Sequence, residues 1–166
     1  TYPALEKGTI DAAEWVGPYD DEKLGFAKVA KYYYTPGWWE GNSSGHMIVN
    51  LKAWEELPKD YQNIFAAACG ESNAMAMAKY DHVNPGALKR LIAGGAQLRP
   101  FPKAVMDACY QAAQEQYAEW SSKVPEFNTM YQHYTKYLAE ELAWFRVAEG
   151  SYDNYMVSTQ TAKRKG

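Results

Sequence analysis

Apolar positions follow two spacings over the first part of the chain, one helical and one strand-like. The spacing of apolar residues predicts a helix over residues 2–9, and residues 10–16 predict a short strand that ends at Gly17. Pro18 suits the first position of a second helix that extends to Val29, because its ring presets a helical φ and no backbone donor is needed there. These residues therefore predict a helix-strand-helix order.

Two more strands are predicted before residue 52. Residues 31–34 are rich in tyrosine and stop at Pro36, and residues 46–51 form a short apolar run. Asn50 is placed to cap a helix that continues to Leu57. Alternation of short helices and strands favours an α/β layer, so we assign residues 1–57 to an α/β portion.

The spacing becomes helical for most of residues 58–166. Residues 60–92 predict one long helix or two broken ones that end at Gly94, and residues 95–101 predict a brief extended segment. Two further helices are expected over residues 105–124 and 130–145, separated by Pro125. The overall expectation is an α/β protein in which short strands are followed by a helix-rich region with a long C-terminal helix.

Composition and charge remove several functional classes. The 166 residues are 47% hydrophobic, enough for one sizeable core, and the net charge is only −3 with scattered basic residues, so no nucleic-acid footprint is present. No apolar run approaches the roughly 20 residues that span a bilayer. Cys69 and Cys109 match no metal or redox spacing, which favours two free thiols while a disulfide stays open.

Two glutamates beside tryptophan are the strongest candidates for chemistry. Glu14 precedes Trp15, and Glu40 follows Trp38 and Trp39, each near the end of a predicted strand. Ligands of open α/β sheets bind outside the carboxyl ends of strands, and a carboxylate walled by indole rings needs a cation or a donor. The alternative, which the sequence leaves open, is that both glutamates are surface carboxylates that form ion pairs with Lys23 or Lys31.

Three sequence stretches carry a resemblance to a known family. They are IDAAEWVGPYDDEKLGFAKVAKYYYTPGWWE, HMIVNLKAWEELP and NPGALKRLIAGGAQLRPFP, at residues 10–40, 46–58 and 84–102, and EWVGP and YTPGWWE are the specific motifs within the first. In this order they resemble the C-terminal half of the solute-binding proteins of tripartite ATP-independent periplasmic (TRAP) transporters, in the branch that binds 2-oxo acids with a metal ion. Thr35 departs mildly from the branch's second motif. The resemblance implies a two-lobed periplasmic binding protein, not an enzyme, with its N-terminal lobe upstream of residue 1.

The same resemblance implies a site and partners. Glu14, the backbone carbonyl of Trp15 and Glu40 would bind Na⁺ or Ca²⁺, while Trp15, Trp38 and Glu40 would contact a small carboxylate such as a 2-oxo acid or hydroxy acid. A further metal ligand and an arginine for the substrate would lie upstream. The ligand would be delivered to a membrane permease, and the C-terminal helices would form a homodimer.

Two other functional classes remain open from the residues alone. A glycoside hydrolase could use Glu14 and Glu40 as acid and base with the tryptophans as a sugar platform, and the separation of the two carboxyl groups would decide this. A structural or interaction protein would use the aromatic residues only as core. Absence of small-molecule binding would favour the latter.

Overall fold

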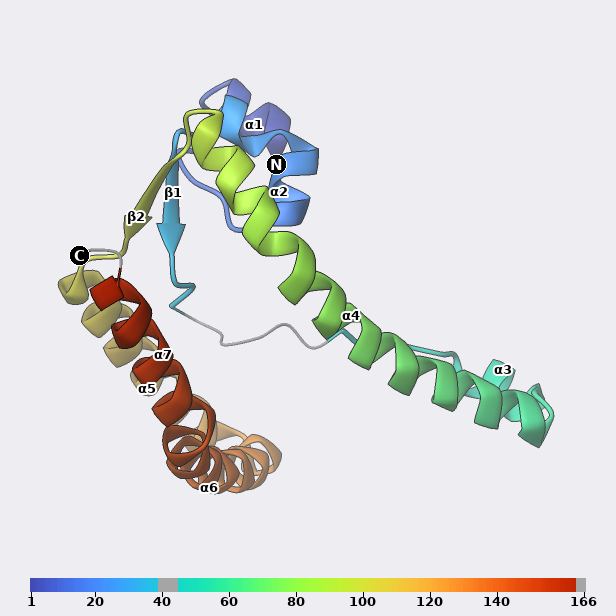
Figure 1. Cartoon of the computed structure of the whole chain (residues 1–166). Helices are drawn as coiled ribbons and strands as arrows, with labels where there is room; N and C mark the ends of the chain where they lie inside the picture. Colours follow the sequence, from blue (N-terminus) through green and yellow to red (C-terminus); the bar gives the residue numbers. More distant parts are fainter. Residues whose placement is uncertain (39–44, 164–166) are drawn as a thin grey trace. The chain divides into compact units, whose positions relative to one another are not determined.

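A computed structural model describes residues 1–38 and 45–163, with the side chains up to residue 160. The chain divides into two compact units, residues 1–107 and 108–166. Figure 1 labels the helices and strands of both. The sequence predicted a change from an α/β portion to a helical portion after residue 57, and the first unit extends beyond that residue. The division into residues 1–57 and 58–166 stays a prediction.

Short helices open the first unit. Helix α1 (Tyr2–Glu6) and helix α2 (Pro18–Leu24) form where predicted, and the 3₁₀ helix η1 (Phe26–Lys28) follows α2. The predicted strand over residues 10–16 is wrong, because this segment is irregular. A strand needs a hydrogen-bonded neighbour, and within the part of the chain that the structure describes the only sheet consists of two other strands.

Gly25 ends α2 in the left-handed conformation, with φ of 74°. Its backbone N–H donates to the carbonyl of Glu22 at 3.1 Å, which closes the last turn. A side chain in this conformation brings Cβ close to the backbone, so Gly25→Ala is expected to lower the free energy of unfolding by about 1–2 kcal/mol.

Denaturant titration of the two glycine variants checks this expectation. Gly70 is the matched control, because it lies inside a helix with no atom within 4 Å of an added Cβ. Gly70→Ala should stabilise by about 0.5–1 kcal/mol through helix propensity. Equal effects of the two substitutions would contradict the role given to the left-handed turn.

The sheet consists of strands β1 (Tyr32–Thr35) and β2 (Gln97–Pro100), paired in parallel with Tyr32 opposite Gln97. Both strands lie where the sequence predicted extended segments. Phe101, just past β2, donates its backbone N–H to the carbonyl of Thr35 at 2.9 Å and stacks on Tyr34 with ring centroids 5.0 Å apart. These contacts fix the end of β1.

Residues 46–50 form no strand, so this second strand prediction is wrong for the described structure. No strand lies beside this segment in the described part of the chain. Its apolar side chains are exposed, and Ile48 is 94% exposed. Helix α3 (Leu51–Glu56) follows directly. Its cap is as predicted, since the side chain of Asn50 accepts the backbone N–H of Ala53 at 3.2 Å.

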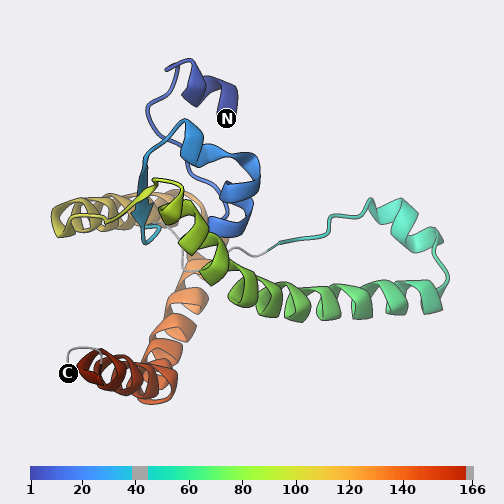
Figure 2. The same cartoon turned by 45° about the horizontal axis from the view of Figure 1, so that its top comes forward.

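Helix α4 (Lys59–Ala93) is one continuous helix that includes Pro85, which decides between the two predicted alternatives. Figure 2 shows α3 beside its first turns, where Trp54 packs edge-on against Phe65 with ring centroids 5.7 Å apart. Its other end carries the buried residues Ala87 and Leu91. The small core of the first unit therefore lies near the C-terminal end of α4.

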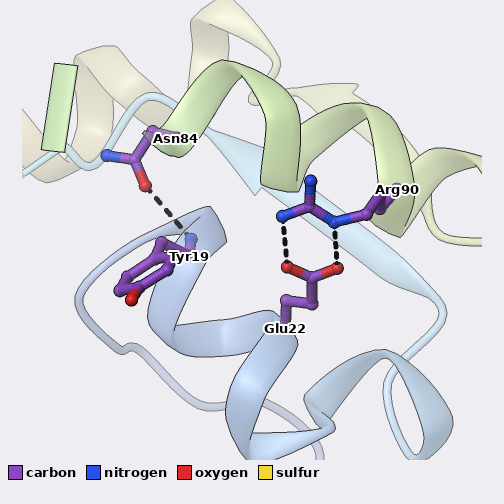
Figure 3. Close-up of polar contacts among 4 residues, drawn as sticks. All are labelled: Tyr19, Glu22, Asn84 and Arg90. Carbon is purple, nitrogen blue, oxygen red and sulfur yellow. Dashed lines mark hydrogen bonds and ion pairs between the residues drawn. The ribbon is translucent and has the colours of Figure 1, made fainter. Parts of the chain in front are cut away.

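Helix α2 is attached to this end of α4 by polar contacts at two points (Figure 3). Glu22 accepts two hydrogen bonds from Arg90, at 2.6 and 2.8 Å, and Asn84 accepts the backbone N–H of Tyr19 at 3.1 Å. A bidentate pair constrains orientation as well as distance. The two contacts together hold α2 in a defined position on α4.

Helix α5 (Lys103–Lys123) continues into the second unit, which also contains α6 (Pro125–Val147) and α7 (Glu149–Lys163). Tyr131 packs between Tyr117 and Phe127, with ring centroids 5.1 and 5.8 Å away. Helix α7 lies beyond the last helix that the sequence predicted. Cys69 and Cys109 are free, as favoured. None of the helices, over the residues described, is long and apolar enough to cross a bilayer.

Candidate functional site

Glu14 and Trp15 lie in the irregular segment that leads into α2, and both are exposed. The indole of Trp15 packs edge-on against Phe26, with ring centroids 6.0 Å apart, and 47% of the residue's surface remains accessible. An aromatic ring that is held on one side and open on the other can serve as the wall of a binding site.

Trp38 lies three residues beyond the end of β1 and is 40% exposed. Glu40 lies outside the described residues. The structure thus places Glu14, Trp15 and Trp38 on segments that adjoin α2 and β1, while the separation of the two glutamates stays a prediction.

The surface-pairing alternative fails for Glu14 where it can be examined. Lys23, one proposed partner, instead donates to the hydroxyl of Tyr19 at 2.7 Å and lies over the same ring. No ion pair among the described residues includes Glu14.

Sequence reasoning missed a buried polar pair next to these segments. Asp21 in the first turn of α2 is only 6% exposed, and the hydroxyl of Tyr33 on β1 donates to its Oδ2 at 2.5 Å. The other oxygen, Oδ1, is buried and has no hydrogen-bond partner in the described part of the chain. Strand alternation was the available signal, because it turns Tyr33 away from Tyr32 and Tyr34.

Burial controls the protonation of this pair. Desolvation raises the pKa of Asp21 above its ordinary value, against the opposing effects of the Tyr33 hydrogen bond and of the Gly17 backbone N–H, and the negative charges of Asp20 and Glu14 raise it further. Desolvation, followed by the bond to Asp21, likewise raises the pKa of Tyr33. Tyr33 therefore stays a protonated donor throughout the physiological range.

The raised pKa of Asp21 predicts a dependence of stability on pH. The folded state holds the proton of Asp21 more tightly than the unfolded state does. The stabilisation that this gives the folded protein is therefore full below the unfolded pKa and is lost as pH rises through the folded pKa. Asp21→Asn removes this loss, and its stability relative to wild type should increase from pH 4 to pH 7.

Urea titration of the full-length protein across that pH range measures the difference. Asp153→Asn, which removes an exposed carboxylate on α7, is the control and should show no such increase. A wild type that gains stability relative to Asp21→Asn as pH rises would contradict the assigned direction.

Glu14 and Trp15 carry oxygen atoms of the kinds that bind Na⁺ and Ca²⁺. Carboxylate and carbonyl oxygens are the ligands of Na⁺ and Ca²⁺, and Glu14 with the carbonyl of Trp15 supplies both kinds. No group of three or more histidine, cysteine, aspartate or glutamate side chains suited to a metal occurs in residues 1–38 and 45–160. Glu40, the third predicted ligand, lies outside the described residues, so its place in a cation site stays a prediction.

Comparison with known proteins identifies the family. Residues 1–123 match the model of the family described as bacterial extracellular solute-binding protein, family 7. The monocarboxylate 2-oxoacid-binding periplasmic protein of Nostoc sp. is 46% identical over 159 residues, which cover 96% of this chain and 44% of that protein.

Two crystal structures of TRAP transporter solute-binding proteins have the same fold. The Bordetella bronchiseptica protein, a mixed-occupancy dimer with calcium and picolinate in one active site, is 55% identical with a TM-score of 0.91 over 98% of this chain and 48% of its own. The Pseudoalteromonas atlantica protein, with bound sodium and pyruvate, is 37% identical with a TM-score of 0.86 over 92% and 47%.

These matches confirm the predicted resemblance and the predicted fold class. The chain spans about half the length of the relatives it matches. The helix-rich structure with a short parallel sheet corresponds to part of their fold. By sequence and by structure, the chain belongs to family 7 of the bacterial extracellular solute-binding proteins.

Proposed function

We propose that the full-length protein is the periplasmic solute-binding subunit of a TRAP transporter, which captures a small monocarboxylate and delivers it to a membrane permease. The 55% identity to a protein that holds calcium and picolinate carries this proposal. The second relative holds sodium and pyruvate, and the curated relative binds monocarboxylate 2-oxo acids. The ligand class proposed here is therefore a 2-oxo acid or a related carboxylate.

Glu14, the carbonyl of Trp15 and Glu40 would hold Na⁺ or Ca²⁺ in this protein. A bound cation supplies positive charge for the substrate carboxylate and offsets the repulsion between the glutamates. The indoles of Trp15 and Trp38 would line the site and exclude water, which strengthens the electrostatic attraction. Partial exposure of both residues, 47% and 40%, supports this role.

Binding of pyruvate and of its methyl ester by the full-length protein tests the proposal. Calorimetry in the presence of both cations should detect pyruvate binding. The methyl ester should bind at least ~30-fold more weakly, because it lacks the charge that the site recognises. Equal binding of acid and ester, or no binding of any small carboxylate, would refute the proposed ligand class.

The enzyme and structural alternatives have less support. Relatives with substantial identity are described as solute-binding proteins, and two of them hold a small carboxylate with a cation. A glycoside hydrolase would turn over a glycoside, and a purely structural protein would bind no small molecule. Both outcomes are measurable with the same preparation.

A homodimer through the C-terminal helices is the finer part of the proposal. Helices α6 and α7 expose many large apolar side chains, among them Leu142 at 62%, Trp144 at 60% and Tyr155 at 66%. Exposed apolar surface of this extent marks an interaction site. The Bordetella bronchiseptica relative is described as a dimer, which supports a second copy as the partner.

Leu142→Glu is expected to convert this dimer to a monomer, because a buried unpaired carboxylate strongly disfavours an apolar interface. Light scattering at micromolar concentration measures the change. Thr9→Glu adds the same charge at an exposed position outside α6 and α7 and should leave the dimer intact. A monomeric wild type, or dimeric Leu142→Glu, would contradict the assigned surface.

A further inference from the structure

Residues 46–50 have the composition of a strand but lie outside the sheet of the described structure. No backbone hydrogen bond between described residues involves residues 46–49. Exposed N–H and C=O groups in a β-prone segment form a template with which another strand can pair. The segment therefore has the hydrogen-bonding capacity of a strand, and it uses none of it within the described part of the chain.

The apolar pattern of this segment indicates the kind of sheet that it fits. Met47, Ile48 and Val49 are consecutive apolar residues, and they are 69%, 94% and 38% exposed. A strand with one face in solvent alternates apolar and polar residues, whereas a continuous apolar run is typical of a parallel strand that is buried on both faces. Helices α3 and α4 follow directly, as crossover helices follow the strands of parallel sheets.

The first half of α4 exposes apolar side chains on one side. Ile64 and Met75 are 64% and 63% exposed, and their separation in sequence corresponds to about three helical turns, so they lie on the same side. Phe65 points elsewhere and packs against Trp54 of α3. Exposed apolar surface that continues from one element to the next marks an interaction site.

The comparisons indicate what covers this surface. The Bordetella bronchiseptica structure matches 98% of this chain, so nearly all of residues 46–77 belongs to the matched part. The match covers only 48% of that protein, which has about as much chain again outside it. A partner within the same polypeptide acts at high effective concentration, whereas a second copy has to bind from solution. These facts favour the rest of the full-length protein as the partner.

We propose that residues 46–50 form a strand in a sheet whose other strands belong to the half of the full-length protein outside this chain. The side of α4 that carries Ile64 and Met75 packs on the same half. The inference rests on the proposed function for the existence of a full-length protein with both halves. It assigns these residues to the interface between the halves and gives them no part in binding the ligand.

Backbone hydrogen exchange in the full-length protein tests the strand. The amides of Met47, Ile48 and Val49 should exchange at least ~100-fold more slowly than in an unstructured peptide, because paired amides exchange only when the structure opens. The amide of Gln97 is the internal reference, since it donates to the carbonyl of Lys31 at 2.7 Å. Unprotected amides at residues 47–49 would overturn the proposal.

Dilution identifies the partner. Pairing within one polypeptide does not depend on concentration, so the protection of residues 47–49 should be the same at about 100 µM and about 1 µM protein. Protection that is lost on dilution would assign the pairing to a second copy and would also overturn the proposal.

Ile64→Glu tests the side of α4 in the full-length protein. It should raise the equilibrium constant of unfolding at least ~30-fold in urea titrations, because a carboxylate buried without a partner disfavours an apolar interface. Met77→Glu is the matched control. Met77 is 65% exposed but lies about 200° further around the helix than Met75, and its substitution should change the constant by less than about threefold. Equal effects would contradict the assigned side.

The outcomes also separate this inference from the proposed function. Pyruvate binding by a full-length protein whose residues 47–49 exchange freely overturns the interface alone. Protected amides in a protein that binds no small carboxylate overturn the proposed function and support the interface.

Discussion

Glu40→Gln is expected to reduce both cation and carboxylate binding in the full-length protein. The substitution keeps the shape and one oxygen ligand but removes a negative charge, so Ca²⁺ affinity should fall at least ~10-fold. Carboxylate affinity should fall with it, because the proposed cation supplies the positive charge that attracts the substrate. Calorimetric titration with Ca²⁺ and then with pyruvate measures both losses in one preparation.

Glu6→Gln is the matched control for that experiment. Glu6 lies on α1 and is exposed, and its substitution changes the net charge equally. It should bind Ca²⁺ and pyruvate as wild type does. Equal losses in both variants would show a general charge effect, and unchanged binding in Glu40→Gln would remove Glu40 from the site.

Trp15→Ala should separate substrate binding from cation binding. The ligand proposed for the cation is the backbone carbonyl, which the substitution keeps, so Ca²⁺ affinity should change by less than about threefold. Pyruvate affinity should fall by roughly 10- to 30-fold, or about 1.4–2 kcal/mol, because the indole that packs on Phe26 forms the proposed wall.

Trp120→Ala controls for the loss of a tryptophan. Trp120 on α5 is 52% exposed, close to the 47% of Trp15. Its substitution should leave pyruvate affinity unchanged. A larger loss of Ca²⁺ than of pyruvate in Trp15→Ala would mean that the indole supports the metal ligands rather than the substrate.

Local signals in the sequence predicted most of the helices. Asn50 caps α3, Pro18 opens α2, and Gly94 follows α4 as expected, because each effect depends on a few neighbouring residues. The segments 31–34 and 95–101 were also recognised as extended. Their pairing was not predicted, since it joins residues more than sixty positions apart.

The errors have a common physical origin in non-local contacts. Residues 10–16 and 46–51 have strand-like composition, but a strand exists only where another strand accepts its hydrogen bonds. Helix α7 is a different case, because Tyr152, Tyr155 and Met156 have helical spacing but no helix was predicted there.

The candidate site was only partly predictable. Glu14, Trp15, Trp38 and Glu40 followed from two short motifs, and the comparisons support the ligand class that the resemblance implied. Asp21 was not among the predicted site residues. Its burial against Tyr33 depends on the packing of α2 beside β1, which no local pattern encodes.

The dependence of pyruvate binding on cations tests whether a cation lies between the two glutamates and the substrate carboxylate. Metal-stripped full-length protein is titrated with pyruvate alone, with Na⁺ and with Ca²⁺, at matched ionic strength, so that screening is constant. We expect weak binding without a suitable cation and a gain in pyruvate affinity of at least ~10-fold when one is added. Pyruvate affinity that is the same in all three titrations would contradict a cation between Glu14, Glu40 and the substrate carboxylate.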